Sequence, residues 1–420
     1  MIVVTVPRTR TGRDMGGEGP VVVVGASAAG LMAAEGLRRA GYAGDLSLVG
    51  SERGLPYDRP PLSKEILTGA WEPDRIRLCA HEKLAELGVT ACFGVTARGL
   101  DLGSRKVALD DGRELGFENL VIATGVEPRA LPGTGGIRGV HTVRTLDDVT
   151  ALRGELGDGK RLVVVGAGFL GTEIAAAART LGAEVCLVEP APEPLAAVVG
   201  IEVGGVISAL HRARGVRVLT GVGVETVRSA DEAVTGVRLA DGTELPADVV
   251  VVAIGAVPST AWLEDSGLDC ADGVRCDRFC AAAPGVYAAG DVANWYHEGY
   301  RARVRLEHRT NATEQGLYVA RAMAGKTEDP FTPVPYFWSD QYDLKLQAFG
   351  LLGGHDEALV VRGTPEGVLD GGDLVALYRR GGEVAGVLGI KAFRALRPLR
   401  SLVAAHASWD EAVAAAEADR

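Results

Sequence analysis

The sequence predicts an α/β fold in which one nucleotide-binding module occurs twice. The first copy is the segment 20–52, where four valines run into the glycine-rich turn GASAAG and then a helix. The second copy is the segment 161–190, where RLVVV runs into GAGFLG, an alanine-rich helix and a strand that ends at Glu189. Each copy reads as strand, tight turn, helix and strand over about 30 residues, which is the pattern of a dinucleotide-binding βαβ unit.

A second pair of matching segments supports the duplication. LDDGRELGFENLVIATG (109–125) and LADGTELPADVVVVAIG (239–255) align without a gap. Each predicts a hairpin turn at Asp-Gly, followed by a buried strand that ends in Ala-x-Gly. Matches at several independent points are more specific than one glycine pattern, so the first turn is not a chance run of small residues.

Length and composition narrow the class of protein. The chain has 420 residues, enough for two or three domains, and its 47% hydrophobic and 24% charged content is that of a globular protein. A net charge of −11 argues against a nucleic-acid partner. No apolar run reaches the ~18 residues that cross a bilayer, so no membrane partner is expected. Residues 1–19 are predicted to be a flexible extension rather than a secretory signal.

The six cysteines are expected to be reduced thiols. They are scattered without a C-x-x-C motif, and Cys276 and Cys280 have no second pair that would complete a zinc site. We therefore predict no metal site and a cytoplasmic location.

The three positions of the glycine pattern have different physical roles. The first glycine makes the tight turn, the second lets the backbone approach a pyrophosphate, and the third packs the helix on the strand. These positions hold Gly25, Ser27 and Gly30 in the first copy and Gly166, Gly168 and Gly171 in the second. Serine is small and its hydroxyl can donate to a phosphate at the helix N-terminus, so the two copies are predicted to bind different dinucleotides.

Glu189 indicates which nicotinamide cofactor the second copy takes. A carboxylate at the end of the second strand accepts the adenosine 2′-hydroxyl and repels a 2′-phosphate. The following PAPEPL adds Glu193 and contains no Lys or Arg. NADH is therefore expected rather than NADPH.

Seven motifs in order carry a family resemblance. They are VVVVGASAAG (21–30), LPYDRPPLSKEIL (55–67), VIATGVEPR (121–129), LVVVGAGFLGTE (162–173), VYAAGDVAN (286–294), EHRTNATEQG (307–316) and PYFWSDQY (335–342). From about residue 20 to about residue 350 the chain resembles the FAD-dependent ferredoxin reductases, of the putidaredoxin reductase and aromatic-ring dioxygenase reductase type.

The resemblance implies two Rossmann-like dinucleotide-binding domains, for FAD and NAD, and a smaller α+β C-terminal domain. The implied ranges are 20–125 and 253–329 for FAD, 126–252 for NAD and 330–420 for the C-terminal domain. The implied activity is that of a ferredoxin–NAD(+) reductase: hydride passes from NADH to FAD, and single electrons pass to an iron–sulfur ferredoxin. That ferredoxin would serve a cytochrome monooxygenase or a dioxygenase, and the chain is expected to be a monomer or a weak homodimer.

The same resemblance assigns site residues. Lys64 would lie near flavin N5, where a cation favours the anionic reduced ring, Glu173 would lie near the nicotinamide, and Trp338 would cover the flavin. These three residues are the predicted catalytic residues. The predicted FAD-binding residues are Gly25, Ser27, Ala29, Gly30, Ser51, Glu52, Arg59, Lys64, Ala97, Ala123, Thr124, Gly125, Arg144, Gly290, Asp291, Arg309 and Trp338. The predicted NAD-binding residues are Gly166, Gly168, Gly171, Glu173, Glu189 and Gly255.

Two positions depart from the family pattern. Ser51 stands where family members place Asp, so either Glu52 takes the adenosine ribose or that contact is weaker. Arg309 stands where relatives place Trp or Val beside the flavin, so its side chain either points outward or alters the docking face.

Three alternative functions share this fold. A disulfide reductase would need a cysteine pair beside the flavin, and the segment 55–67 has none. A flavin redox-sensing protein of the apoptosis-inducing-factor type and a rubredoxin reductase stay open. An acidic ferredoxin would require a local basic face on this acidic chain. The candidate residues for that face are Arg301, Arg303, Arg305, Arg309, Arg394, Arg397 and Arg400.

Overall fold

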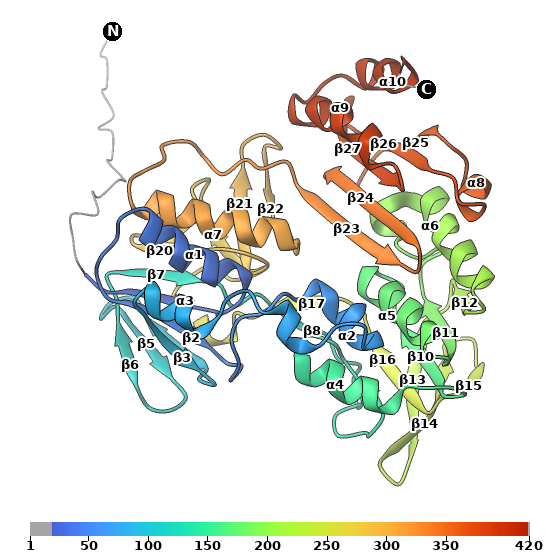
Figure 1. Cartoon of the computed structure of the whole chain (residues 1–420), viewed down its shortest axis with the longest axis horizontal. Helices are drawn as coiled ribbons and strands as arrows, with labels where there is room; N and C mark the ends of the chain where they lie inside the picture. The colour runs from blue at the N-terminus through green and yellow to red at the C-terminus, as the bar shows by residue number, and fades with distance from the viewer. Residues whose placement is uncertain (1–18, 419–420) are drawn as a thin grey trace. The chain divides into compact units, whose positions relative to one another are not determined.

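The computed structural model describes residues 19–418, so the predicted extension at 1–19 lies, except for Gly19, outside the described residues. The chain forms two compact units (Figure 1). The first unit comprises residues up to Tyr57, Arg77–Val126 and Pro258–Thr332. The second comprises Asp58–Ile76, Glu127–Val257 and Pro333 onward. The segment 58–76, which the sequence assigns to the FAD-binding domain, thus groups with the second unit; the boundaries of the cofactor-binding domains stay predictions.

The first unit is built on a six-stranded sheet with the order β19-β20-β7-β1-β2-β3. Strand β1 (Val21–Val24) lies at its centre and pairs in parallel with β2 (Leu46–Gly50) and β7 (Asn119–Ile122). The remaining strands are β3 (Val89–Phe93), β19 (Ala281–Ala283) and β20 (Val286–Ala288). All four valines of β1 are buried, which explains an uninterrupted apolar run in a strand covered on both faces.

Helix α1 (Ala28–Arg39) follows the first glycine turn and packs closely on α7 (Arg309–Met323). A Cβ atom added at Gly316 would lie 2.3 Å from the carbonyl oxygen of Ala29, and one added at Gly36 would lie 2.7 Å from the Cβ of Ala320. Glycine on each helix therefore permits the backbones to approach where they cross. The EHRTNATEQG motif thus owes its last residue to helix packing.

The second unit contains the second copy of the βαβ module. Its five-stranded sheet has the order β12-β11-β10-β16-β9, with β10 (Arg161–Val165) parallel to both β11 (Glu184–Glu189) and β16 (Val249–Val252). The outer strands are β12 (Arg217–Thr220) and β9 (Val140–His141). Helix α5 (Phe169–Thr180) follows the second glycine turn, as the sequence predicts.

The predicted Asp-Gly hairpins adopt the same geometry in both copies. In each, the N–H of the leucine before the turn donates to a carbonyl four residues later at 2.9 Å. The glycine of each Asp-Gly pair has a left-handed φ, +85° at Gly112 and +87° at Gly242. The turns join β5 (Lys106–Leu109) to β6 (Glu114–Gly116) and β14 (Ala233–Leu239) to β15 (Glu244–Pro246). The predicted duplication is confirmed.

The predicted α+β C-terminal domain is confirmed: it is an antiparallel sheet with α9 (Phe393–Ala404) and α10 (Trp409–Ala418) on one face. The sheet has the order β23-β24-β27-β26-β25, and α9 and α10 pack on it (Figure 1). The strands are β23 (Tyr336–Gln341), β24 (Leu344–Gly350), β25 (Glu357–Arg362), β26 (Leu374–Arg380) and β27 (Glu383–Ile390).

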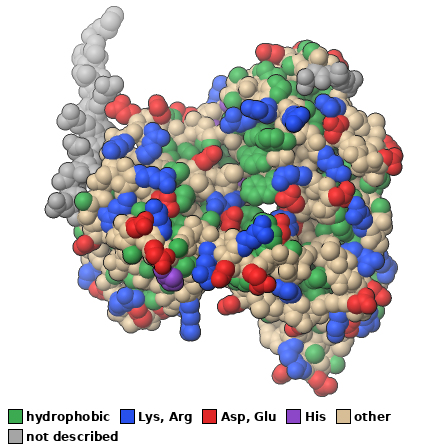
Figure 2. Space-filling model, viewed as in Figure 1, with side chains coloured by type: hydrophobic (Ala, Val, Ile, Leu, Met, Phe, Trp, Pro, Cys, Tyr) green, Lys and Arg blue, Asp and Glu red, His purple; other side chains and the backbone are tan. Residues whose placement is uncertain are grey.

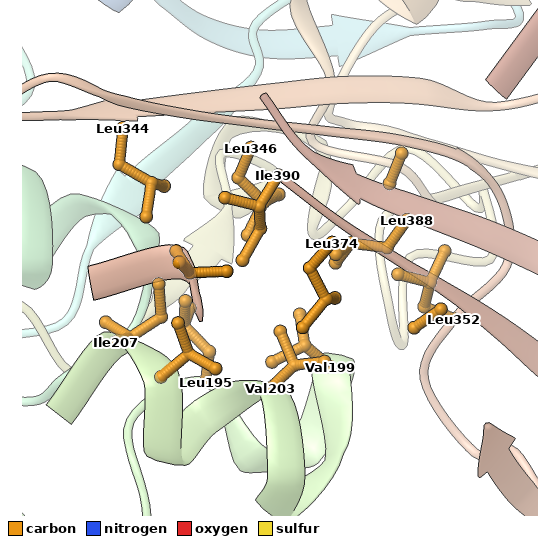
Figure 3. Close-up of a cluster of buried hydrophobic side chains, with 14 of the residues drawn as sticks. Leu195, Val199, Val203, Ile207, Leu344, Leu346, Leu352, Leu374, Leu388 and Ile390 are labelled. Carbon is orange, nitrogen blue, oxygen red and sulfur yellow. The ribbon is translucent and has the colours of Figure 1, made fainter. Parts of the chain in front are cut away.

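Helix α6 (Ala196–Ala213) covers the other face of this sheet. Figure 3 shows Val199, Val203 and Ile207 of α6 pointing toward leucine and isoleucine side chains of β24, β26 and β27. Among the described residues, α6 is the one helix long and apolar enough to span a membrane by length and composition alone. Here its apolar residues form a core cluster with the C-terminal sheet, which accounts for its composition.

The α6 cluster predicts that replacing a buried leucine destabilises the protein far more than replacing an exposed one. Leu346 is fully buried in the cluster, whereas Leu369 is 43% exposed at the end of α8 (Pro365–Leu369). We expect Leu346→Ala to lower the free energy of unfolding by about 2–5 kcal/mol, because it leaves a cavity. Leu369→Ala should change it by less than about 0.5 kcal/mol. Urea unfolding followed by circular dichroism measures both; equal losses would contradict the packing described.

Candidate functional site

The first and third glycines of both turns are required because a side chain there would clash with the protein backbone. Gly25 has a φ of +116°, and a Cβ atom there would lie 2.0 Å from the carbonyl oxygen of Ala123. A Cβ atom on Gly30 would lie 1.9 Å from the carbonyl oxygen of Gly25. The second turn repeats this arrangement: Gly166 meets the Ala253 carbonyl oxygen at 2.5 Å, and Gly171 meets that of Gly166 at 2.0 Å.

The middle position of the turn is not restricted by the chain. A Cβ atom on Gly168 would meet nothing within 4 Å, and Gly168 has a φ of −71° that any residue adopts. Ser27 occupies the equivalent position with a φ of −123°, and its side chain makes no capping hydrogen bond to α1. Neither α1 nor α5 has an acidic residue in its first turn. Both turns therefore fit an anion such as a pyrophosphate, and the Ser27 side chain does not compete for the N–H groups of α1.

The strand ends beside the two turns both carry an acid. In the first unit Glu52 accepts a hydrogen bond from the Tyr57 hydroxyl, whereas Ser51 is exposed. In the second unit Glu189 accepts from the N–H of Ala167 at 2.7 Å and from that of Ala191 at 2.9 Å. These bonds hold each carboxylate at the end of its strand, the position from which a ribose hydroxyl is bound.

Two motifs of the first unit meet at Gly290. The N–H of Gly290 donates to Oε1 of the fully buried Gln315 at 2.9 Å, so the turn before Asp291 is fixed by α7. A Cβ atom on Gly290 would lie 3.0 Å from the Cβ of Ala29, which explains the small residues at both positions. Arg309 donates to the Thr313 hydroxyl one helical turn along, so its side chain lies along α7.

The other predicted residues of the first unit lie at strand ends. Ala97 is buried at the start of β4 (Ala97–Asp101). Ala123 is buried directly after β7, and the Thr124 hydroxyl donates to the Ser259 carbonyl at 2.9 Å. Gly125 has a φ of +70°, and its counterpart Gly255 in the second unit has a φ of +92°.

Glu173 is the most connected side chain of the candidate site. It lies on α5, is 7% exposed, and its Oε2 accepts from Ser63 Oγ at 2.6 Å and from Lys64 Nζ at 2.7 Å. Its Oε1 accepts from Ser339 Oγ at 2.8 Å. The Lys64 side chain is only 13% exposed, so most of the pair is shielded from water. A buried ion pair with its remaining oxygen hydrogen-bonded is a satisfied arrangement, and it joins three separate chain segments.

The proline-rich segment before Lys64 explains how these side chains are presented. Pro60–Ser63 forms a single 3₁₀ turn, and α2 (Glu65–Thr68) follows directly after Lys64. Nearby, the Arg59 guanidinium donates to the Arg144 carbonyl. The Arg144 N–H donates to Asp148, which also closes the capping box of α4 (Leu146–Glu155).

Strand β23 separates Trp338 from Glu173. Its residues alternate between partly exposed and buried, and Phe337, Ser339 and Gln341 share the buried face. Trp338 lies on the opposite face, where its ring stacks on that of Tyr336 with centroids 6.0 Å apart. Of the three predicted catalytic residues, the structure thus brings Lys64 and Glu173 together, while Trp338 faces away from them.

The predicted FAD-binding residues fall in both units, with Arg59, Lys64, Arg144 and Trp338 in the second. Sequence reasoning missed Ser63, Ser339 and Gln315, which hold Glu173 and Gly290 in place. All three lie inside the quoted motifs, so position within a motif was the available signal. In residues 19–418 no group of three or more His, Cys, Asp or Glu side chains is placed to bind a metal.

Comparison with known proteins agrees with this geometry. Residues 19–316 match the family model "Pyridine nucleotide-disulphide oxidoreductase", and residues 336–420 match "Reductase C-terminal". The chain is 34% identical over 374 residues to putidaredoxin reductase of Pseudomonas putida, which covers 87% of each protein. It is 37% identical over 366 residues to the ferredoxin–NAD(+) reductase component of the p-cumate 2,3-dioxygenase system of the same species, with 86% of each covered.

A solved structure gives the same result for the fold. The crystal structure of a covalent putidaredoxin reductase–putidaredoxin complex matches with a TM-score of 0.87 and 32% identity, covering 92% of this chain and 93% of that one. The chain therefore belongs to the pyridine nucleotide-disulphide oxidoreductase family and, within it, to the ferredoxin reductases of the putidaredoxin reductase and dioxygenase reductase type.

Proposed function

We propose that this chain is an FAD-dependent ferredoxin–NAD(+) reductase that takes electrons from NADH and delivers them to an iron–sulfur ferredoxin of an oxygenase system. The observation that carries the proposal is the buried Lys64–Glu173 pair. It sets a cation, on the segment whose resemblance points to the flavin, against a carboxylate on the helix that follows the NAD-type turn. When bound, FAD accepts a hydride from NADH and releases the electrons singly.

The chain's own residues would bind, orient and stabilise these cofactors. The N–H groups at the starts of α1 and α5 would hold the two pyrophosphates. The Lys64 ammonium would favour negative charge on the reduced flavin ring. Because Ser63 and Ser339 also donate to Glu173, the carboxylate and its ammonium partner are held in one orientation rather than left to solvent.

NADH is the proposed nicotinamide cofactor. The Glu189 carboxylate is held at the strand end by two backbone N–H groups, which would present it to a ribose hydroxyl. A 2′-phosphate would meet this negative charge, with Glu193 close by in sequence and no Lys or Arg in 190–195 to compensate it.

The proposed partner is an acidic ferredoxin, and α9 supplies a basic face for it. Lys391, Arg394, Arg397 and Arg400 are exposed on or beside α9, which contains no acidic residue. Figure 2 shows Lys and Arg side chains gathered where α9 lies in Figure 1. Lys391 pairs with Asp343, and Arg303 and Arg305 bond to acceptors of the first unit. The α9 arginines therefore suit a partner better.

We also propose a cytoplasmic location. All six cysteines are free thiols in the structure, as expected of a protein in a reducing compartment.

Cofactor loading and electron transfer test the proposed function directly. The purified protein is expected to be yellow, to contain FAD, and to be reduced faster by NADH than by NADPH in stopped flow. With an iron–sulfur ferredoxin added, it should reduce cytochrome c. Lys64→Gln should retain FAD but slow flavin reduction by about tenfold or more, because it removes the buried cation. The exposed Lys106→Gln serves as the matched control.

Three results would count against this function. A colourless protein that takes up no FAD would contradict it. Flavin reduction in Lys64→Gln as fast as in Lys106→Gln would remove the role assigned to the ion pair. Slow NADH turnover with a long-lived reduced complex, and no ferredoxin reduction, would favour a redox-sensing protein.

The first glycine turn predicts opposite outcomes at neighbouring positions. Gly25→Ala should lower the FAD-to-protein ratio severely, because its Cβ atom would lie 2.0 Å from a carbonyl oxygen. Ser27→Gly should leave it near the wild-type value, because the chain does not restrict the middle position. Gly112→Ala is the control for a left-handed φ alone, since a Cβ atom there meets nothing within 4 Å. Absorbance spectra give the ratio; full FAD content in Gly25→Ala would contradict the geometry.

The basic face of α9 predicts an effect on the ferredoxin step alone. Arg394→Glu combined with Arg397→Glu should slow ferredoxin reduction by about tenfold or more at low salt and less at high salt, because the lost attraction is screened. NADH-driven reduction of ferricyanide, a small acceptor, should be unchanged. Arg217→Glu, at an exposed position on β12, is the control. Unchanged ferredoxin rates in the double variant would place the partner elsewhere.

A further inference from the structure

A chain of buried polar side chains continues from Glu173 into the C-terminal sheet. Ser339 Oγ, which bonds to Glu173, lies 3.2 Å from Nε2 of the fully buried Gln341. Oε1 of Gln341 lies 3.0 Å from Nε2 of His211, which is fully buried on α6. Nδ1 of His211 lies 3.3 Å from the Tyr342 hydroxyl. All of these residues belong to the second unit.

The direction of the first hydrogen bonds follows from the carboxylate. A carboxylate only accepts, so the Ser339 hydroxyl must donate to Glu173 and can only accept from Gln341. The Thr172 hydroxyl donates to backbone carbonyls of its own helix, so it too accepts from Gln341, at 2.9 Å. The amide nitrogen of Gln341 therefore faces Ser339 and Thr172, which turns its oxygen toward His211.

The same logic fixes the tautomer of His211. Because the Gln341 oxygen only accepts, the hydrogen must be on Nε2 of His211, and Nδ1 accepts from the Tyr342 hydroxyl. Burial lowers the pKa of His211 to about 4, so the ring is neutral at pH 7, as this arrangement requires. Burial raises the pKa of Tyr342 to about 12, so its hydroxyl keeps its hydrogen.

Charged groups lie near the Tyr342 end of this series of hydrogen bonds, and they pair with one another. The Arg214 guanidinium lies over the Tyr342 ring, 5.1 Å from its centroid, and pairs with Asp343. Lys391 also pairs with Asp343, at 3.1 Å. In the series Tyr342, His211, Gln341, Ser339, each side chain donates a hydrogen bond in the direction of Glu173. Aligned hydrogen bonds in a low-dielectric interior reinforce one another.

We infer that Gln341 is a positioning residue for hydride transfer, which acts through Ser339 on Glu173 and keeps His211 in its neutral Nε2–H tautomer. The inference rests on the proposed function, because Glu173 in turn holds the Lys64 ammonium. On this inference, β23 of the C-terminal domain helps to orient the carboxylate that is expected near the nicotinamide.

The tautomer of His211 can be tested without any turnover. In the FAD-loaded protein labelled with ¹⁵N-histidine, NMR should show a ring that stays neutral Nε2–H from pH 6 to 8 and whose signal is missing in His211→Gln, which assigns it to His211. Gln341→Met should shift it, because the acceptor for Nε2–H is lost. A charged ring or an Nδ1–H tautomer at His211 would overturn the inference, whatever the enzyme's activity.

The kinetic test compares two variants that each lose one buried hydrogen bond. Gln341→Met should slow flavin reduction by NADH by about tenfold or more. Tyr378→Phe is the matched control. The Tyr378 hydroxyl donates to the Val199 carbonyl at 2.9 Å in the neighbouring core, and this bond lies outside the series from Tyr342 to Glu173. Both variants should lose similar thermal stability, but only Gln341→Met should lose rate.

Combined variants distinguish a loss of Glu173 positioning from a general loss of packing in the domain. Ser339→Ala should cost as much rate as Gln341→Met, and the double variant no more, because both act on the same carboxylate. His211→Gln, which keeps an N–H donor, should retain more rate than His211→Leu. Equal rates in Gln341→Met and Tyr378→Phe, or additive losses in the double variant, would overturn the inference. Absence of NADH-dependent reduction in the wild type would instead refute the proposed function.

Discussion

The second unit depends on the need to satisfy one buried carboxylate. Glu173 is 7% exposed, and an unpaired charge at that depth would cost several kcal/mol. Its three donors come from two segments that lie far apart in the sequence: Ser63 and Lys64 directly before α2, and Ser339 on β23. The carboxylate is therefore satisfied only when both segments are packed against α5. Folding of this unit and assembly of its candidate site are one process.

At the C-terminal sheet, apolar packing and the buried hydrogen bonds have different effects. The cluster of α6 with β24, β26 and β27 buries large aliphatic side chains, which stabilises their packing. Apolar contacts alone allow a strand to shift along its neighbouring helix, whereas hydrogen bonds with a fixed direction do not. On β23, Phe337 contacts the ring of Phe169 on α5, while Ser339 and Gln341 on the same face bond to Glu173 and Thr172 of that helix. The polar pair thus sets the register of the strand against α5.

The sequence predicted local features well because their causes are local. The two βαβ units, the Asp-Gly hairpins and the outer glycines each depend on residues within about 30 positions of one another, and all were found where expected. Lys64 and Glu173 were each singled out, but their pairing joins positions 109 apart and has no local signature. His211 could not be found, because no pattern along the chain says which side chain a buried glutamine will meet. The alternation in PYFWSDQY does place Ser339 and Gln341 on the face of Phe337, but not what lies opposite.

The duplicated turns show which positions are free to diverge. In both copies the chain itself forbids a side chain at the first and third glycines, because a Cβ atom would strike a backbone oxygen. The middle position meets no such restriction, and there the copies differ, with Ser27 against Gly168. The acids differ in place as well, because Glu189 is the last residue of β11 and Glu52 lies two residues beyond the end of β2. The fold therefore allows the middle residue to change without loss of the turn. The serine in the first turn is therefore compatible with an intact module and is not a defect in it.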